Sequence, residues 1–196
     1  MGISGKRHDI ERHDFKRLSA GGYICRIVDC EFGKNKGGQD MLILNVDIYE
    51  GEFAGYFQKS ADRFNKWDYA AIFKRKIFGA NGEDFADPFQ QLLEDIEASN
   101  AGFTFDDGNI DEKDFIGKLC GFVFGDKEYQ KNDGNIGVKA QVTFSKSVAQ
   151  IREGKFKIPP LKKFTAQTTT TPTNAPPPPA DEITDTDNLD MDDPPF

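Results

Sequence analysis

Apolar and polar residues alternate along several stretches of the chain, with the two-residue period of a strand that buries one face. The clearest stretch is residues 41–49, where Leu42, Leu44, Val46 and Ile48 share one side. With the turn signals between the stretches, the pattern predicts five strands, over about residues 23–32, 41–49, 53–59, 118–130 and 137–145. Short turns join the first three strands, so we expect antiparallel pairing.

Two other segments place apolar residues at helical spacing. One runs from Lys66 to Phe78 and the other from Asp87 to Ser99. In the second, Asp87 is suited to the N-cap and Pro88 to the first helical position. Shorter helices are expected over residues 111–115 and 148–152, and an amphipathic one from about Asp9 to Leu18.

The order of these elements predicts a mainly β fold. Five short strands, with a helical insertion between strands 3 and 4 and a hairpin turn at residues 132–135, favour a small Greek-key barrel of the OB type. Gly121 in the fourth strand can relieve a close backbone contact. A small β-sandwich is the alternative.

Composition divides the chain into four parts. Residues 1–20 read as an N-terminal arm and residues 21–165 as the barrel domain. Residues 166–189 form a Thr/Pro-rich linker, and residues 190–196 an acidic tip. Apolar groups are too sparse after residue 165 to repay the entropy of ordering, so we expect a disordered C-terminal tail.

The charge is unevenly distributed. The net charge of −8 separates into −1 for residues 1–165, which hold all 25 Lys and Arg, and −7 for residues 166–196. The body is therefore close to neutral and can carry a basic face. An acidic total does not exclude a nucleic-acid binder, because binding depends on where the charges lie.

The sequence carries no signature of catalysis or of a metal site. It lacks a nucleophile elbow, a Walker loop and an H-E-x-x-H motif. Cys25, Cys30 and Cys120 lack the paired short spacings of a zinc site, so we expect small reduced core residues. Asp106-Asp107 reads as a solvated turn, with a metal-dependent nuclease as the weaker alternative. We therefore expect neither an enzyme nor a cofactor.

No apolar run approaches 18 residues and the first residues are charged, so we expect no membrane segment and no signal peptide. The body instead mixes basic and aromatic residues, the chemistry that tracks phosphates and stacks bases. Candidate nucleic-acid-binding residues are Lys34, Lys36, Tyr49, Phe53, Tyr56, Lys59, Arg63, Trp67, Lys74, Arg75 and Lys76.

Among these candidates, Tyr49 and Tyr56 are the expected stacking residues, and Phe57 is assigned to the core. A solvated helix face is the alternative for residues 74–76. The basic segment 155–163 is expected to pack on the barrel, because Phe156, Ile158 and Leu161 need burial; DNA contact is its alternative.

The chain ends in a specific pattern of acids, prolines and an aromatic ring. Its terminal carboxylate and Phe ring can enter one partner pocket while the upstream acids meet a basic rim. The candidate partner-binding residues are Asp190, Met191, Asp192, Asp193, Pro194, Pro195 and Phe196.

This tip resembles the acidic C-terminal tip of bacterial single-stranded DNA-binding proteins, which recruits replication, recombination and repair proteins. The body is similar to the single-stranded DNA-binding proteins of tailed bacteriophages, a family long known as a phage domain of unknown function. The similarity covers most of residues 21–164 and is most specific at residues 153–159, Glu-Gly-Lys-Phe-Lys-Ile-Pro. The linker departs from the pattern, because it is longer and richer in Thr and Pro.

The resemblance implies an OB-fold protein without a catalytic role that coats single-stranded DNA, with little sequence preference, during phage DNA replication or recombination. It also implies a location in the host bacterial cytoplasm and recruitment of a polymerase, helicase, recombinase or nuclease through the tip. The alternative is a protein-interaction adaptor or recombination accessory factor without intrinsic DNA affinity.

Overall fold

The computed structural model describes residues 16–165 of the 196-residue chain. The linker, the tip and most of the arm lie outside the described residues, so their predicted properties stay predictions. Within the described part, residues 16–18 are not helical, although the predicted arm helix extended to Leu18. Leu18 is instead buried in the core.

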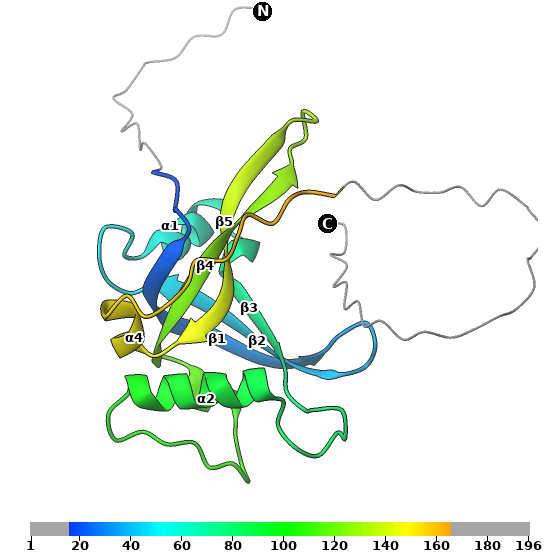
Figure 1. Cartoon of the computed structure of the whole chain (residues 1–196), viewed down its shortest axis with the longest axis vertical. Coiled ribbons are helices and arrows are strands. Elements are labelled where there is room, and N and C mark those ends of the chain that lie inside the picture. Colours follow the sequence, from blue (N-terminus) through cyan, green and yellow to red (C-terminus); the bar gives the residue numbers. More distant parts are fainter. Residues whose placement is uncertain (1–15, 166–196) are drawn as a thin grey trace, which may run out of the picture. The chain divides into compact units, whose positions relative to one another are not determined.

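Five strands form one antiparallel sheet across the described residues (Figure 1). They are β1 (Gly21–Lys34), β2 (Asp40–Ile48), β3 (Ile72–Lys76), β4 (Leu119–Gln130) and β5 (Ile136–Lys146). The hydrogen-bonded order is β3-β2-β1-β4-β5, and the sheet curls until its two edge strands approach each other. The Arg75 guanidinium on β3 donates to the carbonyl oxygen of Thr143 on β5 at 2.5 Å. The predicted OB-like barrel is thus confirmed in a nearly closed form.

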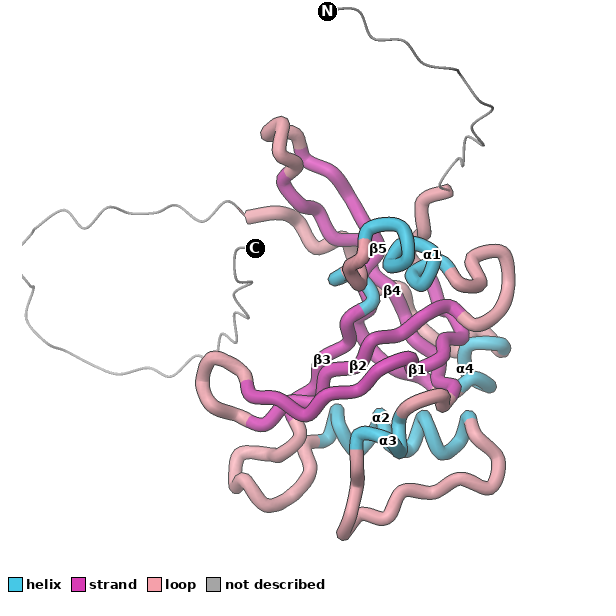
Figure 2. Tube along the Cα trace, turned by 180° about the vertical axis from the view of Figure 1, so that it is seen from behind, coloured by secondary structure: helices cyan, strands magenta, loops and turns pink. Residues whose placement is uncertain are grey.

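Short helices lie around this barrel (Figure 2). They are α1 (Tyr56–Phe64), the 3₁₀ turn η1 (Tyr69–Ala71), α2 (Asp87–Ser99), α3 (Glu112–Phe115) and α4 (Val148–Arg152). The predicted bounds of α2 and α4 are confirmed, although the N-cap of α2 is Ala86. α2 lies between β3 and β4 in the chain and covers one end of the barrel, where Phe89, Leu92 and Ile96 are buried.

The prediction for the third strand is wrong. Residues 53–59 leave β2 through a turn and enter α1, because Gly55 adopts the left-handed conformation with φ of 73°. The buried carboxylate of Asp47 fixes this turn by accepting from the Phe57 backbone N–H at 2.9 Å. The third strand is residues 72–76, inside the segment predicted to be helical.

The apolar faces of the strands meet inside the barrel. The four alternating residues of β2, from Leu42 to Ile48, are at most 2% exposed, as their pattern predicts. Phe57 is also buried, as predicted, and its ring stacks on Phe124 of β4 with centroids 5.8 Å apart.

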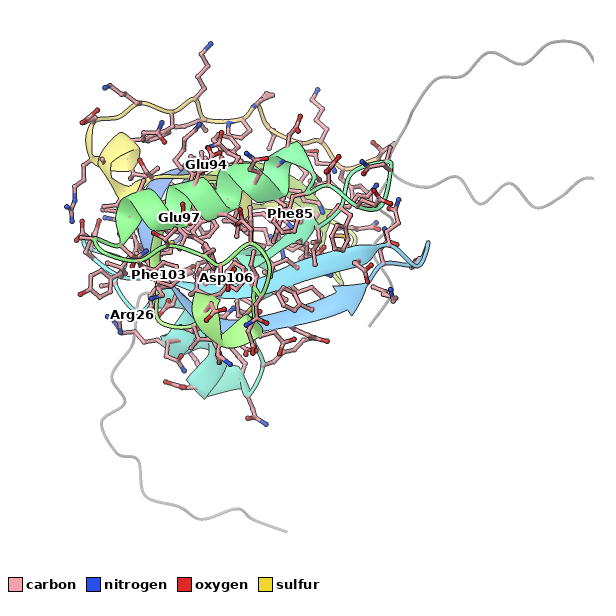
Figure 3. All side chains as sticks on the ribbon, turned by 90° about the horizontal axis from the view of Figure 1, so that it is seen from below. Arg26, Phe85, Glu94, Glu97, Phe103 and Asp106 are labelled. Carbon is pink, nitrogen blue, oxygen red and sulfur yellow. The ribbon has the colours of Figure 1, made fainter. Side chains whose placement is uncertain are left out.

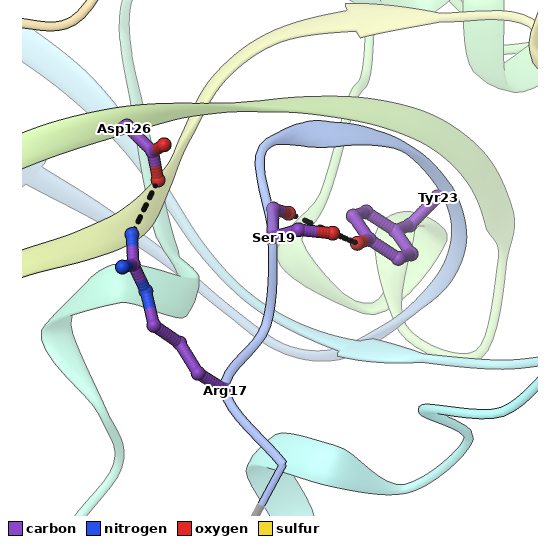
Figure 4. A network of polar contacts seen from close by, with 4 residues as sticks. All are labelled: Arg17, Ser19, Tyr23 and Asp126. Atoms are coloured by element: carbon purple, nitrogen blue, oxygen red, sulfur yellow. Dashed lines mark hydrogen bonds and ion pairs between the residues drawn. The ribbon is translucent and has the colours of Figure 1, made fainter.

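Residues 16–20 are tied to the barrel by polar contacts (Figure 4). The Arg17 guanidinium pairs with the Asp126 carboxylate of β4 at 2.9 Å. The Tyr23 hydroxyl donates to the backbone oxygen of Ser19 at 2.9 Å. The chain therefore lies against β4 before it enters β1.

After α4, residues 155–164 run back along β4 and form a segment that we call the strap (Figure 1). Phe156 packs on the cluster of Ile24, Val123 and Ile151, which confirms the expected packing of this residue. Ile158 and Leu161 stay 53% and 43% exposed, so the expectation that they are buried is wrong. Backbone hydrogen bonds of Lys162 hold the strap's far end to β4, although the two apolar side chains stay exposed.

Candidate nucleic-acid interface

Glycines on β1 and β4 mark the part of the outer barrel surface that other segments cover. A Cβ on Gly22 would lie 2.6 Å from the Phe156 ring, and one on Gly121 would collide with Ile151 of α4. A Cβ on Gly125 would lie 3.2 Å from Pro159 of the strap. α4 and the strap therefore occupy this surface, while partly exposed polar and aromatic side chains remain on β3, β5 and the neighbouring η1 and β4.

Four of these side chains meet where β3 approaches β5, and we call them the Tyr69 cluster: Tyr69, Lys74, Tyr129 and Lys139. The ammonium groups of Lys74 and Lys139 each lie 5.7 Å from the centroid of the Tyr69 ring. The Lys139 ammonium also lies 5.6 Å from the Tyr129 ring. The two rings are 38% and 37% exposed, so parts of their faces are open to solvent.

Local structure fixes the two rings in place. The Asp68 carboxylate caps η1 by accepting from the Ala70 backbone N–H at 2.8 Å, and this positions Tyr69 just before β3. Tyr129 is paired with Gly137 across the β4–β5 hairpin. A Cβ on Gly137 would lie 2.7 Å from the Tyr129 ring, so only glycine lets this ring lie over β5.

The cluster is suited to a polyanion that carries flat rings. Within the described residues, neither Lys74 nor Lys139 has an ion pair with a carboxylate. Two ammonium groups beside partly open aromatic faces can hold phosphates while bases stack on the rings. The cluster also adjoins the loop between the fourth and fifth strands, a region that OB folds use to bind oligonucleotides.

The three consecutive basic residues of β3 have different environments. Lys74 belongs to the Tyr69 cluster, and Lys76 lies two residues further on the same outer face. Arg75 points the other way, with its guanidinium carbon 3.9 Å from the Phe73 ring centroid and its hydrogen bond to Thr143. Burial lowers the pKa of Arg75 to about 10. Arg75 therefore serves the closure of the barrel.

The predicted aromatic candidates lie outside the Tyr69 cluster. Tyr49 is 44% exposed, but the Arg26 guanidinium already lies 4.5 Å from its ring centroid. Phe53 and Tyr56 are half-buried and meet edge to face, with ring centroids 5.9 Å apart. Trp67 is half-buried against the core, and its indole nitrogen has no hydrogen-bond partner among the described residues.

The remaining basic candidates are dispersed. Lys34 is paired with Asp40 at 2.6 Å, and Lys36 lies exposed in the β1–β2 turn. On α1, the Lys59 ammonium donates to the carbonyl oxygen of Ala54 at 3.0 Å. Arg63 lies 5.4 Å from the Phe64 ring centroid. Of the predicted candidates, the structure places only Lys74 in the Tyr69 cluster, with Lys76 on the same face.

Sequence reasoning missed Tyr69, Tyr129 and Lys139. Tyr69 lies in the segment predicted to be a helix, two residues after the candidate Trp67. Tyr129 and Lys139 lie on opposite arms of the β4–β5 hairpin, ten residues apart in sequence. The exposed period-2 positions on both arms of this hairpin were the available signal.

A second concave feature lies beside the α2 end of the barrel, where Figure 3 labels Phe85, one of its lining residues. It is a cavity of about 620 Å³ with an apolar lining that includes Phe78, Phe85 and Phe89. Its charged lining residues are Lys34 and Asp40, which form an ion pair, and Asp107, so the lining has a net negative charge that disfavours phosphates. Electrostatics therefore favour the Tyr69 cluster over this cavity as a nucleic-acid site.

The cysteines are buried and none forms a disulfide. Burial raises the pKa of the Cys25 and Cys120 thiols, and it raises that of Cys30 to about 12, which keeps all three protonated at neutral pH. Across residues 16–165, no group of three or more His, Cys, Asp or Glu residues is placed to hold a metal ion.

No protein-family model and no curated protein sequence matches the chain. None of the helices in the described part is long and apolar enough to cross a membrane. The resemblance to phage single-stranded DNA-binding proteins therefore stays a hypothesis, and it enters below only as part of a proposal.

Proposed function

We propose that this protein binds single-stranded DNA, without strong sequence preference, at the outer face of β3 and β5. The Tyr69 cluster is the observation that carries the proposal. It combines two partly exposed rings with two ammonium groups that have no carboxylate partner among the described residues. In this role the protein coats exposed strands during phage DNA replication or recombination in the host bacterial cytoplasm.

The acidic tip completes the proposed role. Residues 190–196 recruit a replication or recombination protein, such as a polymerase, helicase, recombinase or nuclease, while the barrel holds the strand. The terminal Phe196 and the acids before it suit an apolar pocket with a basic rim. The protein itself performs no chemical step.

Titration of fluorescent oligo-dT with the full chain tests the DNA-binding step. We expect saturable binding that is tighter than binding to a duplex of the same length and that weakens steeply with salt, because bound lysines release counterions. Equal affinity for single and double strands would refute the proposal. Incubation with Mg²⁺ or Mn²⁺ should leave the oligonucleotide intact.

The cavity beside α2 favours one other function. Its apolar lining, with Phe78, Phe85 and Phe89, is suited to an apolar side chain of a protein partner. An adaptor of this kind needs no DNA affinity, so the same titration separates the two functions: an adaptor leaves the anisotropy of oligo-dT unchanged.

A further inference from the structure

The far end of the strap is built into the sheet as a short additional strand. The Lys162 backbone N–H donates to the backbone carbonyl oxygen of Asp126 at 2.9 Å. The backbone carbonyl oxygen of Lys162 accepts from the Glu128 backbone N–H at 2.9 Å. These bonds pair Lys162 with Lys127 in a parallel bridge, beyond the point where β1 leaves β4. The Phe164 N–H adds a bond of 3.0 Å to the Glu128 carboxylate. Lys162 is therefore held at a fixed position.

This register aligns three lysines across three neighbouring segments. Lys127 faces Lys162 on one side and Lys139 of β5 on the other. Paired residues of adjacent strands point to the same face of a sheet, about 4.8 Å apart. Since Lys139 reaches Tyr69, which Lys74 also flanks, the row continues from the strap to β3. We call Lys162, Lys127, Lys139 and Lys74 the lysine row.

Like charges directly opposite one another in a sheet repel, so the pairs Lys162–Lys127 and Lys127–Lys139 favour an anion bound beside them. The acids that precede and follow Lys127 point to the other face of β4. There Asp126 pairs with Arg17, and Glu128 accepts from Phe164. Lys162, like Lys74 and Lys139, has no ion pair with a carboxylate among the described residues. Other described lysines, such as Lys36 and Lys157, also lack such an ion pair, so the alignment of the lysines across neighbouring segments is what distinguishes the row.

We propose that the strap is one wall of the nucleic-acid site, and that the lysine row is a phosphate track running across the strands from Lys162 to the Tyr69 cluster. This inference rests on the proposed function. It adds the strap to the binding site and gives the path of the bound strand across the sheet. The bound strand crosses the strap, β4, β5 and β3 in turn. A bound polyanion relieves the repulsion within the row, and this gain in free energy strengthens binding of the strand.

The experiment measures oligo-dT affinity of the full chain against salt concentration, for wild type, Lys162→Gln and the control Lys113→Gln. Lys113 is an exposed lysine on α3, paired with Asp111 at 2.8 Å and outside the row. For single strands each lost phosphate contact makes the negative slope of log K against log salt shallower by about 0.7. Lys162→Gln should therefore bind about eightfold more weakly than wild type at 50 mM salt and about threefold more weakly at 200 mM. Lys113→Gln should retain the wild-type slope.

A charge reversal separates binding from folding. Lys162→Glu places an acid opposite Lys127, so it should raise the melting temperature and weaken DNA binding further than Lys162→Gln. A purely structural role of Lys162 predicts loss of stability together with loss of binding. If wild type binds oligo-dT and Lys162→Gln keeps both its affinity and its slope, the strap is not part of the track. If wild type itself fails to bind, the proposed function fails.

Discussion

Replacement of Tyr69 by leucine is the sharpest test of the candidate interface. Leucine keeps apolar volume beside β3 but removes the flat ring on which a base can stack. It also removes the ring that lies 5.7 Å from the ammonium groups of Lys74 and Lys139. The lysines themselves stay in place, so the substitution isolates the contribution of the ring.

The size of the effect follows from the exposure of the ring. Stacking of a base on an aromatic side chain contributes about 1–3 kcal/mol. Because Tyr69 is 38% exposed, only part of its face can meet a base, and we expect the lower part of that range. A loss of about 1–2 kcal/mol corresponds to a Kd for oligo-dT that rises about 5- to 30-fold.

Fluorescence anisotropy with labelled oligo-dT gives the Kd, and thermal unfolding monitors the fold. Tyr69→Phe is the matched control, because it keeps the ring and should stay within about twofold of wild type, far from the effect of losing a stacked base. The slope of log K against log salt should be unchanged in Tyr69→Leu, since no phosphate contact is lost. The reasoning is refuted if Tyr69→Leu is folded and binds as tightly as wild type.

Three further outcomes are expected. Tyr49→Leu should change the Kd for oligo-dT less than Tyr69→Leu, because the Arg26 guanidinium lies closer to the Tyr49 ring centroid, at 4.5 Å, than the two lysines lie to that of Tyr69, at 5.7 Å; a larger change would favour a site around Tyr49. Gly22→Val should lower stability by about 1–3 kcal/mol in denaturant unfolding, because its Cβ would meet Phe156; an unchanged midpoint would show that the strap moves freely. Burial raises the pKa of Asp95, so its ionisation costs stability above the ordinary pKa of about 3.9, and Asp95→Asn should raise the melting temperature at pH 7 but hardly at pH 3. A variant less stable than wild type at pH 7 would contradict this assignment.

Alternation and helical spacing were sufficient to predict most of the barrel. Four strands and the helices α2 and α4 begin and end within two residues of the predicted positions. In β2 one face is apolar over its whole length, so a single period fits, and in the other three strands the period holds over the central part. The alternation of apolar residues in the sequence follows directly from which side chains are buried.

The third strand could not be found in this way because it is short and preceded by small residues. Ala70, Ala71, Phe73 and Ile77 are all buried, and their spacing suits a helix as well as a turn followed by a strand. Only the pairing of β3 with β2 decides between them, and that contact joins residues about thirty positions apart. The same error hid Tyr69, since its neighbours follow from the position of β3 beside β5.

The lysine row depends on the length of the β4–β5 turn, because one residue more or less changes which side chains share a face. The sequence indicated a four-residue turn at 132–135, which would place Lys127 opposite Ala140 and turn Lys127 and Lys139 to opposite faces. In the structure the Lys131 N–H donates to the Asn135 oxygen at 2.8 Å, and Gly134 is left-handed with φ of 83°, so the turn has three residues. Since a slip of one residue reverses every side chain of a strand, Gly134 is what brings Lys139 onto the face of Lys127. The basic face is thus encoded in backbone conformation as much as in the positions of the lysines.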